Sequence, residues 1–250
     1  MILLAVPNIS EGRRPEVVKD IAGNDSAFLD VHIDPDHNRA VLTYGGTADE
    51  LVAASVRVID RAVDLLDINE HDGVHPRFGV VDVLPIVAYD ATGADAEGVA
   101  DRIAAHVPMP VYRYTDNLPA LRRRLRRPHL THPTAGVICI GIRPPLIAFN
   151  VNLRSDLELA KRIVRLLREL DGVRALAFEL PSRGLVQVSM NLTKPGVAGP
   201  RAAYDRITAL AEGRVVDAEI VGLVPESVSA ELESIPLRRP ARTIEDALRR

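Results

Sequence analysis

The chain has 250 residues, of which 47% are hydrophobic and 26% charged, and this composition is ordinary for a globular protein. Its 34 acidic and 31 basic residues leave a formal net charge of −3, which argues against a general nucleic-acid binder but not against a local basic cleft. The single cysteine, Cys139, excludes an intramolecular disulfide, and its apolar neighbours favour a buried role over a reactive thiol. The N-terminal apolar run is too short for a signal peptide and no segment approaches a membrane span, so we expect a cytoplasmic protein.

Short runs rich in Val, Ile and Leu alternate with longer amphipathic stretches, which predicts an α+β fold. In the first half the expected order is strand, helix, strand, strand, helix, strand, at residues 2–7, 14–24, 27–33, 39–45, 47–66 and 80–88. Thr47 is the expected N-cap of the second helix, with Asp49 and Glu50 in its first turn. Residues 95–141 then predict a helix, a short strand at 111–114 and an arginine-rich stretch, 121–129, in which a solvated helical face is favoured over an anion site.

The second half repeats the same order of elements. The expected elements lie at residues 146–152, 156–170, 173–179, 185–192, 200–212 and 215–221, followed by a short helix at 243–249. Ser155 can cap the first of these helices, and Gly172 suits a left-handed position after it. Each half has the βαββαβ order of a ferredoxin-like fold and an asparagine near the end of its first strand, Asn8 and Asn152. We therefore predict two ferredoxin-like subdomains, residues 1–143 and 144–250, packed around a cleft that holds the site.

The densest group of reactive side chains is the loop of residues 71–82, which carries two histidines, an arginine and two aspartates between glycines and a proline. Polar groups on such a loop, next to a buried strand, are a common way to display catalytic side chains. His75 is the expected acid–base catalyst, because imidazole titrates near neutral pH. Residues 7–13, 32–39 and 187–191 are further polar clusters, and for 32–39 a capped turn and a functional role are equally favoured.

Other kinds of chemistry are less favoured. The side chains of His32, Asp34, His37, His71 and His75 are suitable ligands for zinc or for a two-metal hydrolase, but a glycine and a proline argue against a helical pair of ligands at residues 71 and 75. Ser10 and Ser189 lie in no nucleophile motif, and there is no phosphate-binding or dinucleotide fingerprint. Acid–base chemistry by a histidine, with anions bound by arginines and backbone amides, remains.

Taken together, the clusters resemble the formiminotransferase domain, the family of glutamate formiminotransferase and of the first half of formiminotransferase-cyclodeaminase. The matching motifs lie, in the family's order, at residues 6–13, 34–39, 75–82, 110–112, 132–136, 146–152, 187–192 and 221–225. The resemblance implies two ferredoxin-like subdomains, a homodimer, and transfer of a formimino group between N-formiminoglutamate and tetrahydrofolate in histidine degradation. It implies that His75 is the catalyst, that tetrahydrofolate is a co-substrate and that no metal is needed. The implied substrate- or folate-binding residues are Asn8, Ser10, Glu11, His37, Asn38, Arg39, Arg77, Gly79, Asp82, Thr131, His132, Pro133, Thr134, Gly136, Asn152, Gln187 and Asn191.

The chain also departs from the family pattern. Val74 stands where a glutamate commonly precedes the catalytic histidine, and His32 stands where a carboxylate is usual. The segment between Tyr114 and His132 is a few tens of residues shorter, and the part after residue 225 is abbreviated. The alternatives are therefore a diverged module that binds folate or a small anion, a transferase or hydrolase of another formimino or formyl compound, and a metal-dependent hydrolase.

Overall fold

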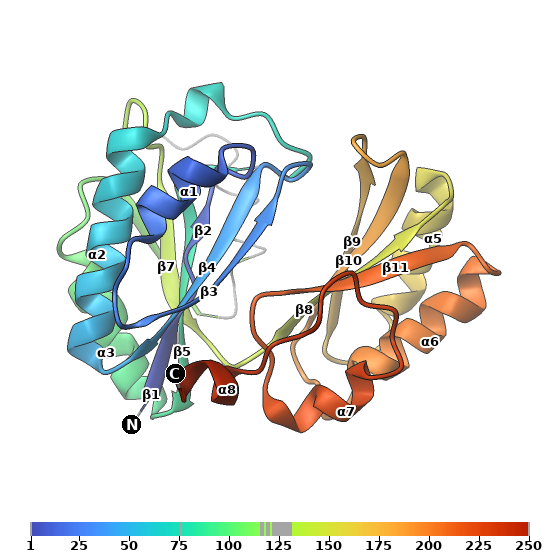
Figure 1. Ribbon diagram of the computed structural model, residues 1–250. Coiled ribbons are helices and arrows are strands. Elements are labelled where there is room, and N and C mark those ends of the chain that lie inside the picture. The colour runs from blue at the N-terminus through green and yellow to red at the C-terminus, as the bar shows by residue number, and fades with distance from the viewer. Residues whose placement is uncertain (1, 76, 116–117, 119–120, 122–131, 250) are drawn as a thin grey trace. The chain divides into compact units, whose positions relative to one another are not determined.

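The computed structural model describes residues 2–75, 77–115, 118, 121 and 132–249, and the chain forms two compact units, Met1–Pro145 and Leu146–Arg250 (Figure 1). Each unit has its own sheet and its own hydrophobic core, so the predicted α+β class is confirmed. Within the described residues, no helix is both long and apolar enough to cross a membrane.

The first unit is built on a seven-stranded sheet. Its strands are β1 (Ile2–Ala5), β2 (Asn8–Ile9), β3 (Phe28–Asp34), β4 (Arg39–Gly46), β5 (Val81–Asp90), β6 (Val111–Tyr114) and β7 (Ile138–Arg143). Strands β1 and β2 both pair antiparallel with β4 and with β5, and β3 pairs with the other edge of β4. Strand β7 runs parallel to β5, and β6 runs parallel to β7.

Helices α1 (Pro15–Ala22), α2 (Ala48–Leu65) and α3 (Gly93–Ala104) lie together along one side of this sheet (Figure 1). Their apolar stripes pack against strand residues such as Leu3, Leu42 and Ile86, which are completely buried. Thr47 caps α2 as predicted, because its side chain accepts from the backbone N–H of Glu50 while the Glu50 carboxylate accepts from Thr47 in return. Strand β7 was not predicted: its run of small and apolar residues is buried beside β5, and only the burial of Cys139 was foreseen.

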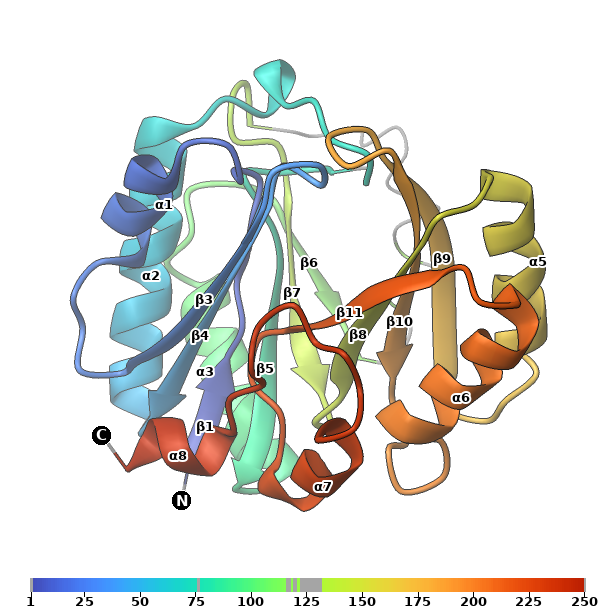
Figure 2. The ribbon, with the colours of Figure 1, turned by 45° about the vertical axis from the view of Figure 1, so that its right-hand side comes forward.

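The second unit has the elements β8 (Ile147–Leu153), α5 (Leu157–Leu167), β9 (Val173–Leu180), β10 (Leu185–Leu192), α6 (Pro200–Ala211) and β11 (Val215–Val221). The sheet order β11-β8-β10-β9, antiparallel throughout, is that of a ferredoxin-like fold. Helices α5 and α6 cover one face of the sheet (Figure 2), and alternate strand residues such as Phe149 and Val151 are buried beneath them. Asn150 and Asn152, between those apolar residues, belong to the opposite face.

Two local predictions in this unit need correction or refinement. The N-cap of α5 is Asp156, whose carboxylate accepts from the backbone N–H of Leu159 at 2.8 Å, and not Ser155. Gly172 has the expected positive φ, 81°, but it lies in the turn before β9, since α5 already ends at residue 167. The tail contains η2 (Glu226–Val228), α7 (Ser229–Leu232) and α8 (Ile244–Leu248), and only the last of these was predicted.

Candidate functional site

The loop of residues 71–82, which we call the site loop, is bound to the turn between β3 and β4. The backbone N–H of Val74 donates to the carbonyl of Asp36 at 3.2 Å. The Asn38 side chain donates to the carbonyl of Asp72 at 3.1 Å and accepts from the backbone N–H of Gly12 at 2.9 Å. Asn38 has a φ of 44°, a left-handed conformation that asparagine tolerates better than most residues. One asparagine thus joins three segments that are distant in sequence.

This contact brings two histidines together. A side chain at Gly73 would meet the His37 carbonyl at 2.4 Å, so glycine allows the loop to lie directly on the turn. His37 is only 1% exposed, and its backbone N–H donates to the Asp34 carboxylate at 2.9 Å. The His37 and His75 rings have centroids 6.5 Å apart and are tilted by 39°. The predicted catalyst is therefore held beside a buried imidazole.

The segment before α1 supports the other end of the site loop. The Ser10 hydroxyl donates to the carbonyl of Gly79 at 2.7 Å. The Glu11 carboxylate accepts from the backbone N–H of Arg13 at 2.7 Å and from the side chain of Arg14 at 2.6 Å. Burial alone would raise the pKa of Glu11, but these hydrogen bonds hold it below its usual range. Two residues predicted to bind substrate thus support the loop and the start of α1.

Arg77 and Asp82 form a buried ion pair inside the loop. The distance between Nη1 and Oδ2 is 3.3 Å, and the side chains are 2% and 1% exposed. Asp82 also accepts from the backbone N–H of Phe78 at 2.9 Å, and Arg77 donates to the carbonyl of Ile9 at 3.4 Å. Both predicted residues therefore fix the path of the chain that leaves His75.

Residues 132–136 form a turn that packs against the site loop. The ring nitrogen Nδ1 of His132 accepts from the backbone N–H of Ala135 at 3.0 Å, so the ring closes the turn. Gly136 has a φ of 71° and bridges to Gly79, where neither residue has room for a side chain. Thr131, also predicted as a site residue, lies outside the described residues.

The same turn is also tied to the short helix η1 (Ile68–Glu70), which precedes the loop. The carbonyl of Thr134 accepts from the backbone N–H of Ile68 at 2.7 Å, and that of Pro133 accepts from the Asn69 side chain at 2.8 Å. Main-chain carbonyls of this turn therefore bind the helix that leads into the site loop.

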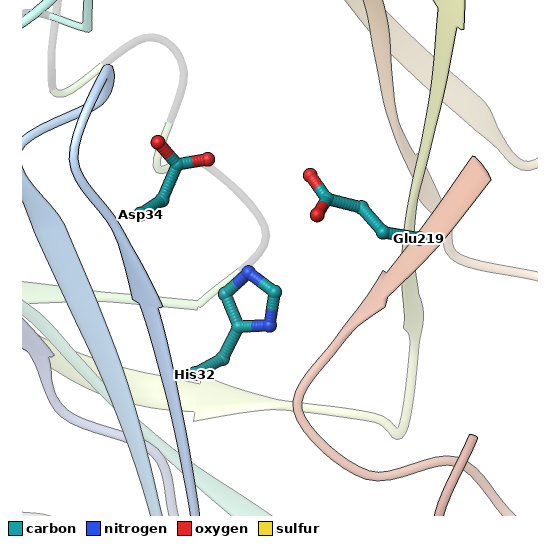
Figure 3. Close-up of side chains that lie close together, drawn as sticks. All are labelled: His32, Asp34 and Glu219. Atoms are coloured by element: carbon teal, nitrogen blue, oxygen red, sulfur yellow. The ribbon is translucent and has the colours of Figure 1, made fainter. Parts of the chain in front are cut away.

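The remaining predicted residues of this unit lie on the strands. Asn8 lies on β2, and its amide donates to the carbonyl of Val6 at 3.1 Å. Arg39 begins β4, in register with Asp34 on β3. His32 and Asp34 are alternate residues of β3, and their side chains leave the same side of the strand (Figure 3). A zinc site needs at least three protein ligands, so these two side chains do not define one by themselves.

The second unit carries a polar network on the face of its sheet opposite α5 and α6. Asn152 and Gln187 are directly opposed on β8 and β10, and the Gln187 amide donates to Asn152 at 3.1 Å and to Glu219 at 3.2 Å. Asn152 donates to Asp217 at 2.6 Å, and Asn150 donates to Glu219 at 3.0 Å. Glu219 projects from β11, as Figure 3 shows.

Arginines complete this network. The guanidinium of Arg183 lies 2.6 Å from Asp217, and that of Arg238 lies 3.4 Å from Glu219. Burial alone would raise the pKa of Asp217, but hydrogen bonds from Arg183 and Asn152 lower it. The third predicted residue of this unit, Asn191, lies near the end of β10 and is exposed.

Sequence reasoning missed the acidic half of this network. Asp217 and Glu219 are alternate residues of a predicted strand, and they are in register with Asn152 and Asn150. Alternation of polar residues along neighbouring strands was the available signal, because such residues share one face of a sheet.

Comparison with known proteins decides the family. The family model described as "Formiminotransferase domain, N-terminal subdomain" matches residues 2–129, and the one described as "Formiminotransferase domain" matches residues 148–234. The chain is a member of the formiminotransferase family. The resemblance inferred from the motifs is thus confirmed, as is the prediction of a transferase of this family.

Named relatives of this formiminotransferase-family chain cover most of its length. It is 36% identical to the glutamate formimidoyltransferase of Thermoplasma acidophilum, over 88% of this chain and 87% of that protein. The corresponding protein of Streptococcus pyogenes serotype M1 is 29% identical, over 90% of this chain and 89% of that protein. The formimidoyltransferase-cyclodeaminase of Sus scrofa is 32% identical over 88% of this chain, but the match spans only 49% of that longer protein.

Proposed function

We propose that this chain transfers a formimino group between N-formiminoglutamate and tetrahydrofolate, and that His75 is the acid–base catalyst. The observation that carries the proposal is the anchoring of the site loop. Hydrogen bonds from the β3–β4 turn, from Ser10 and from residues 132–136 hold the segments on both sides of His75. The relatives named as glutamate formimidoyltransferases support the choice of substrates.

The transfer requires one proton to be removed from the attacking nitrogen and one to be delivered to the departing nitrogen. A nitrogen of tetrahydrofolate attacks the formimino carbon and loses its proton, and the bond from that carbon to the glutamate nitrogen then breaks. The departing nitrogen must regain a proton to leave as an amine. One imidazole, His75, can accept the first proton and return it in the second step, which is worth ~10²–10⁴-fold in rate.

In this proposal the predicted binding residues of the two units have two different tasks. Ser10, Glu11 and the Arg77–Asp82 pair hold the loop, since their polar atoms bond to the chain itself. Asn152 and Gln187 order the polar network of the second unit, since their amides bond to each other, to Asp217 and to Glu219. A homodimer, a cytoplasmic location and independence from metal ions are parts of the same proposal. Sedimentation velocity tests the first, and activity in the presence of a chelator tests the last.

The experiment is a coupled assay with a matched histidine control. The protein is incubated with tetrahydrofolate and formiminoglutamate, acidified, and assayed for the absorbance of methenyltetrahydrofolate. We expect a signal from the wild type and from His106→Ala, since His106 is exposed on the segment after α3. We expect His75→Ala to lose ~10²–10⁴-fold in rate while its melting temperature stays close to that of the wild type.

The other outcomes identify the alternatives. Full activity in His75→Ala would remove this histidine from the mechanism. Binding of tetrahydrofolate without turnover would indicate a binding module, and turnover of a different formimino compound would indicate a diverged transferase. Activity that a chelator abolishes and zinc restores would indicate metal-dependent chemistry.

A further inference from the structure

His71 lies four residues before His75, where η1 ends and the site loop begins. Its backbone N–H donates to the carbonyl of Ile68 at 3.2 Å, which fixes the start of the loop. Both ring nitrogens are shielded from solvent, and neither makes a hydrogen bond within the part of the chain that the structure describes. Nearly all buried polar atoms in folded proteins are hydrogen-bonded, so this exception requires an explanation.

Burial and the arginines around His71 favour the neutral form of its ring. Burial lowers the pKa of the imidazole, and the guanidiniums of Arg77 and Arg13 lower it further. Two groups act in the opposite direction, and burial outweighs either of them. The Ser10 carbonyl lies near enough to the ring to favour its protonated form, although the two do not have hydrogen-bonding geometry. The Asp82 charge also favours the protonated form. A neutral imidazole offers one N–H donor and one nitrogen acceptor. The ring can therefore make two hydrogen bonds that none of the described residues makes with it.

The sign of the surrounding charge selects the partner. The arginine charges near His71 favour an anion over a cation, and a protonated formimino group is a cation. Arg77 is already paired with Asp82, but Arg13 is half exposed, and its contact with Asp72 is long, at 3.9 Å. A carboxylate beside His71 could accept from the ring N–H and pair with Arg13.

We propose that His71 is a substrate-binding residue whose ring N–H donates to a carboxylate of a substrate, with Arg13 supplying the positive charge. The inference rests on the proposed function, because that function defines the substrates. Formiminoglutamate and the glutamyl tail of tetrahydrofolate both carry carboxylates, and the experiment distinguishes these two sources. His71 thus binds the anion, while proton transfer belongs to His75.

The test is the variant His71→Phe, with His106→Phe as its matched control. Phenylalanine keeps a flat ring of similar size but removes both polar atoms. Since the His71 ring makes no hydrogen bond to the residues that the structure describes, we expect the melting temperature of His71→Phe to stay at or above that of the wild type. We expect KM to rise roughly 10–100-fold for one substrate, because a hydrogen bond to a charged group is lost. A change of less than about threefold in kcat would show binding rather than chemistry.

The two substrates are titrated separately, and each result is decisive. A raised KM for formiminoglutamate assigns the carboxylate to the amino acid, and a raised KM for tetrahydrofolate assigns it to the folate tail. His71→Gln, which restores an N–H donor, should recover part of the loss and also serves if His71→Phe does not fold.

Unchanged KM values for both substrates would overturn the inference and leave the proposed function intact. A fall of several degrees in melting temperature with unchanged KM values would show a structural histidine. If the wild type itself does not turn over, the proposed function fails instead. Calorimetric titration of wild type and His71→Phe with formiminoglutamate or tetrahydrofolate alone then still tests whether His71 binds the carboxylate.

Discussion

Replacing Asp82 by asparagine tests how strongly the site loop depends on its buried ion pair. Asp82 and Arg77 are almost completely shielded, with 3.3 Å between their charged atoms. Asparagine keeps the shape of the side chain and can still accept from the backbone N–H of Phe78, but the negative charge is lost and an NH2 group replaces the oxygen that pairs with Arg77. The Arg77 guanidinium then stays buried without the Asp82 charge beside it. Removal of one partner from a buried pair costs about 3–5 kcal/mol.

Thermal unfolding followed by circular dichroism measures this cost. At 2–4 °C per kcal/mol for a protein of this size, the melting temperature of Asp82→Asn should fall by about 6–20 °C. The control is Asp49→Asn, since Asp49 pairs with Arg102 at 2.8 Å but the two side chains are 87% and 49% exposed. An exposed pair of this kind contributes less than about 1 kcal/mol.

The double variant Arg77→Met, Asp82→Asn decides whether the lost charge is the cause. With both charges removed, the protein should regain part of the stability that Asp82→Asn loses. An Asp82→Asn variant as stable as Asp49→Asn would refute the reasoning. So would a double variant whose loss of stability equals the sum of the losses in Asp82→Asn and Arg77→Met alone. Either result would mean that water or another group compensates the Arg77 charge.

Two further predictions concern the loop contacts and the response to acid. Gly136→Ala should lower the free energy of unfolding, measured with urea, clearly more than Gly184→Ala. Both glycines have a positive φ, which costs alanine about 1–2 kcal/mol. Only at Gly136 would the added methyl group also meet a backbone oxygen, that of Phe78, at 2.1 Å. The second prediction concerns acid. The pKa of His71 is 6.5 in the unfolded chain and lower in the folded chain, because of burial and the Arg77 charge. As the pH falls through 6.5, the unfolded chain therefore binds this proton before the folded chain does. Stability should therefore fall below that pH and level off below the folded pKa, and urea titrations should show a smaller fall for His71→Phe. Equal costs for the two glycine variants, or equal pH profiles for wild type and His71→Phe, would contradict these predictions.

The order of elements could be predicted because it follows from local periodicity. The strands at 185–192 and 215–221 have the predicted ends, and Thr47 caps the predicted helix. The N-cap of α5 was harder to predict, because Ser155 and Asp156 can both accept from a helix N–H. The backbone conformation that makes Asp156 the cap does not follow from the local sequence. Strand β7 was missed because a short apolar run that is buried in a parallel pair shows no alternation.

The sequence points to the residues of the site loop but not to the contacts that they make. The loop around His75 was selected because its histidines, arginine and aspartates stand between glycines and a proline, ahead of an apolar run. The contact from Ser10 to Gly79 spans 69 residues and that from Asn38 to Asp72 spans 34, and no local pattern encodes such pairings. Hydroxyl and carboxylate groups that the sequence suggested for substrate therefore prove to bond to the chain itself.

The glycines of the site explain how a loop can be a precise support. Added side chains at Gly73, Gly79 and Gly136 would meet backbone oxygens at 2.4, 1.9 and 2.1 Å, so three main-chain segments are in direct contact there. Main-chain contacts leave little room for adjustment, and catalysis gains most when the reacting groups are held in place beforehand. A methyl group at any of these positions should therefore displace His75 as well as destabilise the fold. The fractional loss of turnover in such variants should exceed the fraction of protein that is unfolded. If the two fractions are equal, the loop serves stability alone.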